Sequence, residues 1–87
     1  MRNVRLLIEY DGTDYAGWQW QKNDRTIQET LSKAIGQVIQ EPIKLYGASR
    51  TDAGVHAQGQ VANFKTTSDI PSEQLLHAIN FYLPHDI

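Results

Sequence analysis

Apolar and polar side chains alternate with a period of two over the first ten residues. This period is typical of a strand that buries one face, because successive side chains of a strand point to opposite sides. The segment Asp11-Gly12-Thr13, a combination common in turns, follows directly. The pattern therefore predicts a first strand whose buried face carries Val4, Leu6, Ile8 and Tyr10.

A helix is predicted after a loop over residues 14–25, which is rich in Gly and aromatic residues. Thr26, with Glu29 three residues later, has the form of a capping box. Pro42 prevents the helix from continuing, since proline lacks the N–H that an inner helical turn requires. The predicted helix covers residues 27–40, with apolar residues at helical spacing: Ile27, Leu31, Ala34, Ile35, Val38 and Ile39.

Two further strands and a second helix are predicted in the remaining sequence. Residues 43–46 form a short apolar segment, a loop covers 48–55, and residues 60–65 are the next strand. The second helix opens at residues 70–73 and ends before Pro84. Its apolar face is expected to carry Leu75, Leu76, Ile79 and Leu83.

The predicted order of elements is β-α-β-β-α, which indicates an α+β fold. This order is that of a split βαβ unit, the ferredoxin-like or RRM-like arrangement, with helices on one face of an antiparallel sheet. The final strand of such a unit would begin near Ile87. We therefore expect residues 1–87 to be one domain of a longer protein.

Composition restricts the function classes without selecting one. The chain has 87 residues, no Cys, and 8 Lys and Arg against 10 Asp and Glu, for a net charge of −2. Disulfides and thiolate metal sites are thereby excluded, and a generic basic nucleic-acid binder is disfavoured. A signal or membrane segment is not evident in the sequence, so we expect a cytoplasmic protein without membrane contact.

The densest group of reactive side chains lies in residues 47–57, Gly-Ala-Ser-Arg-Thr-Asp-Ala-Gly-Val-His-Ala. Arg50 and Asp52 are two residues apart and would point the same way in an extended segment. A neighbouring guanidinium favours the ionised carboxylate that a nucleophile or base requires. An ordinary turn with a surface ion pair is the alternative that these residues alone leave open.

The segment resembles the signature of the tRNA pseudouridine synthase A family, whose members modify the anticodon stem-loop. Other segments resemble that family in the expected order, so that the resemblance covers nearly the whole chain: residues 10–21, 26–29, 58–61, 78–80 and 83–84. Ser49 is a departure, since many members carry Gly before the Arg. Serine is also small and suits the same loop.

The resemblance implies an isomerase that converts uridine in tRNA to pseudouridine, with Asp52 as the catalytic residue. It also implies Arg50, Thr51 and His56 as substrate-binding residues, no metal or organic cofactor, and a homodimer. Attack by the carboxylate on C1′ of the ribose or on C6 of the ring both remain open. Residues 1–87 would be the N-terminal domain that carries the catalytic motif, and we expect this domain alone to be inactive.

Rival interpretations concern the aromatic loop and the class of protein. Tyr15, Trp18 and Trp20 could stack on bases beside Lys22 and Arg25, but aromatic residues of a small domain more often pack in its core. His56 could form part of a metal site, yet shaping the loop by a hydrogen bond is the simpler role. A non-catalytic RRM-like RNA-binding module is the main alternative, although the aromatic RNP motifs of such modules are missing here.

Overall fold

The sheet is built around two long antiparallel strands. A computed structural model describes all residues 1–87, with β1 at Arg2–Tyr10 and β3 at Ala57–Thr66. Val4 lies opposite Phe64 and Leu6 opposite Ala62 in the register of the pair. The alternation predicted for the first strand is therefore confirmed, with Ile8 and Tyr10 buried.

The second strand in the sequence, β2, is shorter than predicted and begins later in the chain. It covers Tyr46–Gly47 instead of residues 43–46, and it pairs with β3 in a sheet of order β1-β3-β2. The backbone carbonyl of Leu45 accepts a hydrogen bond from the side chain of Gln28, at 2.7 Å. This bond joins the segment just before β2 to the first turn of α1.

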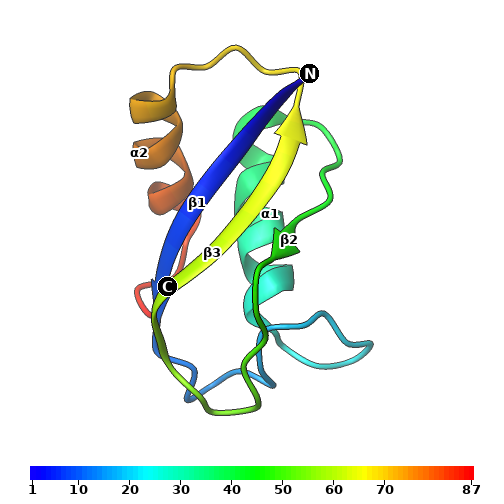
Figure 1. Ribbon diagram of the computed structural model, residues 1–87, viewed down its shortest axis with the longest axis vertical. Coiled ribbons are helices and arrows are strands. Elements are labelled where there is room, and N and C mark those ends of the chain that lie inside the picture. Colours follow the sequence, from blue (N-terminus) through cyan, green and yellow to red (C-terminus); the bar gives the residue numbers. More distant parts are fainter.

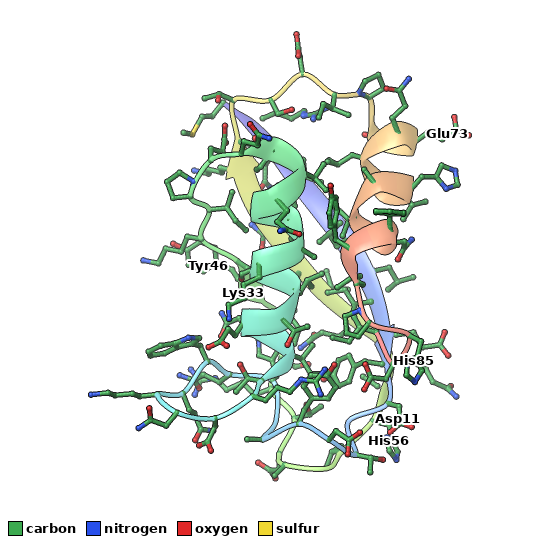
Figure 2. The ribbon with its side chains drawn as sticks, turned by 180° about the vertical axis from the view of Figure 1, so that it is seen from behind. Asp11, Lys33, Tyr46, His56, Glu73 and His85 are labelled. Atoms are coloured by element: carbon green, nitrogen blue, oxygen red, sulfur yellow. The ribbon has the colours of Figure 1, made fainter.

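Both helices lie on one face of the sheet (Figures 1 and 2). Helix α1 covers Ile27–Ile39, and its N-cap residue Thr26 accepts a hydrogen bond from the backbone N–H of Glu29 at 3.3 Å. The Glu29 carboxylate pairs with Lys33 at 3.3 Å, so only half of the capping box forms. Helix α2 covers Ser72–Tyr82.

The element order β-α-β-β-α confirms the predicted α+β architecture of an antiparallel sheet with two helices. The core lies between the sheet and the helices, and its largest fully buried apolar side chains are Phe64, Ile27, Leu31, Ile35 and Leu75. Neither helix is long and apolar enough to cross a membrane. The loops after β1 and before β3 lie together at one end of this sheet (Figure 1).

Candidate active site

Two loops that are distant in the sequence interlock at this end of the sheet. The aromatic loop (residues 11–25) follows β1, and the signature loop (residues 48–56) precedes β3. The N–H of Trp18 donates to the carbonyl of Thr51 at 3.1 Å, and the N–H of Gly54 donates to the carbonyl of Tyr15 at 3.1 Å. The signature loop is therefore held by backbone bonds that do not depend on its own side chains.

Glycines in the aromatic loop allow the two backbones to approach so closely. A Cβ atom on Gly12 would overlap the backbone carbonyl of Val55. Gly17 has a φ of +94°, and a Cβ there would lie 2.6 Å from the carbonyl oxygen of Thr51. Any larger residue at these positions would push the loops apart or strain the backbone.

Asp52 and Arg50 lie on the signature loop with exposed side chains. The backbone carbonyl of Asp52 accepts a hydrogen bond from the N–H of Val55 at 3.2 Å. The ion pairs of the structure are Lys33 with Glu29 and His56 with Asp11. Arg50 and Asp52 are thus not paired with each other, and both charged groups are accessible to a ligand.

Thr51 is half-buried between these two exposed residues. Its Oγ1 lies 2.7 Å from the hydroxyl of Tyr10, within hydrogen-bonding distance. Residue 49 is also fixed, because the side chain of Gln60 hydrogen-bonds the hydroxyl and the backbone carbonyl of Ser49. The residues around Asp52 are therefore anchored to β1 and to β3.

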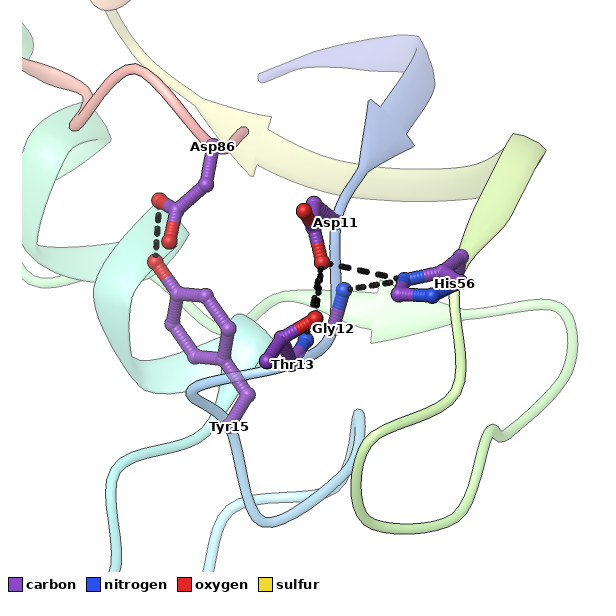
Figure 3. A network of polar contacts seen from close by, with 6 residues as sticks. All are labelled: Asp11, Gly12, Thr13, Tyr15, His56 and Asp86. Carbon is purple, nitrogen blue, oxygen red and sulfur yellow. Dashed lines mark hydrogen bonds and ion pairs between the residues drawn. The ribbon is translucent and has the colours of Figure 1, made fainter.

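His56 joins the two loops through its Nδ1 atom (Figure 3). The N–H of Gly12 donates to Nδ1 at 2.9 Å, and a carboxylate oxygen of Asp11 lies 3.1 Å from the same atom. A neutral ring with its proton on Nε2 accepts from Gly12, whereas a protonated ring donates to Asp11. The pKa of Asp11 is lowered, mainly by the hydrogen bonds that its carboxylate accepts from Thr13 and to a smaller extent by the nearby His56.

The aromatic residues divide between core and surface. Tyr15 and Trp18 are buried, whereas Trp20 is 55% exposed. The hydroxyl of Tyr15 donates to Asp86 at 2.8 Å, and Arg25 donates to that hydroxyl at 3.2 Å while its guanidinium lies 4.6 Å from the ring centre. Sequence reasoning missed this network, because no spacing rule connects residues 15, 25 and 86.

The buried position of Tyr15 makes stability sensitive to alkaline pH. Burial, and then the hydrogen bond to Asp86, raise the pKa of Tyr15 from 10.0 to about 12. The unfolded chain loses this proton at lower pH than the folded chain does, so the contribution of Tyr15 is complete below pH 10 and is lost as the pH rises through about 12.

We expect the free energy of unfolding to fall less steeply over this range in Tyr15→Phe than in the parent chain. Urea unfolding of residues 1–87 at a series of alkaline pH values measures the slope. Tyr46→Phe, which changes a half-exposed ring, is the control. Equal slopes for Tyr15→Phe and the parent chain would contradict the raised pKa of Tyr15 as the source of this pH dependence.

The arrangement has the features of an enzyme site. An accessible carboxylate sits on a backbone that is hydrogen-bonded on both sides, next to an accessible cation. Fixing the backbone around a reactive group is what pre-organised active sites require. No three side chains of the types that bind metals come together in the molecule. The fold and the loop thus define an α+β domain that presents an exposed aspartate on a fixed loop.

Comparison with known proteins gives the family. A sequence model described as tRNA pseudouridine synthase matches residues 6–87. The chain therefore belongs to the tRNA pseudouridine synthase family. The resemblance seen in the signature loop is confirmed by a match that extends over nearly the whole sequence.

Individual relatives agree with the family match. The chain is 61% identical over 87 residues to a tRNA pseudouridine synthase A of Thermoanaerobacter sp. (strain X514), and 59% identical to one of Acetivibrio thermocellus. Both alignments cover 100% of this chain and 36% of the relative. A tRNA pseudouridine synthase A 2 of Clostridium tetani is 58% identical over 88 residues, with 99% and 36% covered. The chain thus spans 36% of the length of these curated relatives.

Proposed function

We propose that this chain is the catalytic-motif domain of a tRNA pseudouridine synthase, with Asp52 as its nucleophile. The observation that carries the proposal is the exposed carboxylate of Asp52 on a loop whose backbone is hydrogen-bonded to the aromatic loop and whose Thr51 side chain contacts Tyr10 of β1. Membership of the family supplies the reaction class. The substrate is a uridine in the anticodon stem-loop of tRNA, and the complete enzyme is a homodimer.

The reaction is an isomerisation that requires no external reagent. The C1′–N1 bond of uridine breaks, the uracil turns, and a C1′–C5 bond forms while N1 gains a proton and C5 loses one. Carboxylates stabilise or trap the positive charge that develops at a glycosidic carbon, as retaining glycosidases illustrate. Attack of Asp52 at C1′ would displace N1 from the sugar directly, whereas addition to C6 would form a covalent adduct of the ring whose C1′–N1 bond breaks in a following step.

Reaching the uridine requires that it leave its stack in the RNA. Enzymes that act on a base in a helix or stacked loop extrude the nucleotide into a pocket. Arg50 is exposed two residues before Asp52, and we propose that its guanidinium contacts the extruded nucleotide. The exposed ring of His56 would contact the substrate, while its Nδ1 atom accepts the hydrogen bond from the N–H of Gly12.

The net charge of this domain bears on which part of the enzyme binds the phosphate backbone of the RNA. The chain has a net charge of −2, whereas binding to the phosphate backbone of RNA depends on Lys and Arg. We therefore propose that most phosphate contacts come from the rest of a complete synthase or from the second subunit of the dimer. This domain then supplies the reactive carboxylate and the contacts to the target nucleotide.

The test uses a complete synthase that carries these 87 residues. Nucleoside mass spectrometry after incubation with unmodified tRNA should show pseudouridine in the anticodon stem-loop, and a lack of product would refute the proposed activity.

The Arg50→Ala variant should lose more in single-turnover rate than in tRNA affinity, because Arg50 engages one nucleotide. An intact rate with a large loss of affinity would mean that Arg50 only binds phosphate.

A further inference from the structure

The backbone on both sides of the Asp52 side chain is fixed by hydrogen bonds. The preceding carbonyl, that of Thr51, accepts from Trp18 at 3.1 Å, and the carbonyl of Asp52 accepts from Val55 at 3.2 Å. The direction of a Cα–Cβ bond is determined by the backbone on either side of it. The hydrogen-bonding of these two carbonyls therefore fixes the position of the Asp52 Cβ atom, from which the carboxylate extends.

The Thr51 side chain adds a third anchor to the same point. Its Oγ1 atom lies 2.7 Å from the hydroxyl of Tyr10, a contact between residues 41 positions apart in the sequence. No other side-chain hydrogen bond of Tyr10 or of Thr51 is formed in the structure. Thr51 is thus held at its carbonyl by one loop and at its hydroxyl by the end of β1.

Tyr10 is itself rigidly placed, so it can act as an anchor. It is the last residue of β1, lies opposite Ala57 in the register, and is 3% exposed. Its ring stacks against that of Trp18, with centroids 6.4 Å apart and planes 26° apart. Trp18 is the residue whose N–H holds the Thr51 carbonyl, so both anchors of Thr51 belong to one packed aromatic pair.

We propose that Tyr10 is a positioning residue for Asp52 and that it acts through the hydroxyl of Thr51. The inference rests on the proposed function, in which Asp52 is the nucleophile. Thr51 then serves the reaction because its attachment to β1 fixes the position of the next residue, Asp52. The Thr51 hydroxyl bonds Tyr10 and not the substrate. Small displacements of a reacting group cost large factors in rate, so losing this anchor should slow the chemical step.

The test is a double-mutant cycle in a complete synthase that carries these residues. Tyr10→Phe removes only the hydroxyl, and Thr51→Val replaces the threonine hydroxyl by a methyl group of similar size. Each variant should lower the single-turnover rate at saturating tRNA by about tenfold, with tRNA affinity within about twofold of the parent. The double variant should be no slower than either single variant, because both remove the same bond.

Three further measurements separate the inference from its rivals. Thr51→Ser keeps the hydroxyl and should retain most of the rate that Thr51→Val loses. Unchanged rates accompanied by a lower unfolding temperature would show that the bond only stabilises the fold, and rate losses that simply add would show that the two residues act separately. Asp52→Asn in the same assay tests the proposed function: activity in that variant would refute the nucleophile itself, whereas an inactive Asp52→Asn beside a fully active Tyr10→Phe would refute only the positioning role.

Discussion

Replacing Asp52 by Asn should abolish pseudouridine formation in a complete synthase while leaving tRNA binding nearly intact. The substitution is almost isosteric, and the Asp52 side chain forms no ion pair whose loss could disturb the loop. It removes the negative charge and the nucleophilic oxygen. Losing such a group commonly lowers a rate by roughly a thousandfold or more.

The carboxylates of Asp11 and Asp86, at the same end of the sheet, are not free to replace Asp52. Asp11 belongs to the interlocked loop, but one of its oxygens already accepts from the N–H of Thr13 at 3.0 Å and from the Thr13 hydroxyl at 2.6 Å. The same oxygen lies against His56. Asp86 accepts from the buried hydroxyl of Tyr15. Both groups are therefore engaged in structural contacts.

The assay pairs nucleoside mass spectrometry after long incubation with a gel-shift titration of the same tRNA. Binding should survive because it depends mainly on phosphate contacts spread over a large surface. Asp69→Asn is the matched control: it makes the same change of charge at an exposed residue between β3 and α2, at the opposite end of the sheet. If Asp52→Asn still produced pseudouridine at about a tenth of the parental rate, Asp52 would not be the nucleophile.

The sequence predicted the elements because their signals are local. Alternation over β1 and helical spacing in α1 and α2 show which face of each element is buried, and both patterns lie in consecutive residues. Leu76 is an exception: it was predicted on the buried face of α2 but is 54% exposed. The predicted position of β2 was wrong, because the ends of so short a strand are decided by its pairing with β3, which covers only Tyr46 and Gly47. Such a contact has no signature in the segment itself.

The sequence predicted where the candidate residues lie in the fold, but not the contacts that hold their loop. The motif placed Arg50 and Asp52 on one loop, and the structure agrees, although the expected influence of a neighbouring guanidinium is not realised as an ion pair. Exposed charges on a loop gain little from pairing, because water screens them. The role of the aromatic loop as a clamp could not be read from the sequence, since the bonds from Trp18, Gly54 and Gly12 are tertiary contacts.

The interlocking of the two loops leads to a large expected effect at Gly12. This residue is buried, its N–H is donated to His56, and a Cβ added to it would overlap the backbone carbonyl of Val55. Backbone atoms cannot move aside as a flexible side chain can, so the loops must separate. We expect Gly12→Ala to destabilise the domain by about 3 kcal/mol, the cost of overpacking a close contact together with the loss of the hydrogen bond to His56.

Gly36→Ala is the control, and it should change stability in the opposite direction. Gly36 lies within α1, where a Cβ would be 3.9 Å from the backbone oxygen of Glu41, which is an ordinary contact. Alanine is favoured over glycine in a helix interior by roughly 1 kcal/mol, so this variant should be more stable than the parent. Urea unfolding of residues 1–87, followed by circular dichroism, measures both changes under identical conditions. If Gly12→Ala unfolded at the same urea concentration as the parent chain, the two loops would not be in the close contact on which the placement of Asp52 depends.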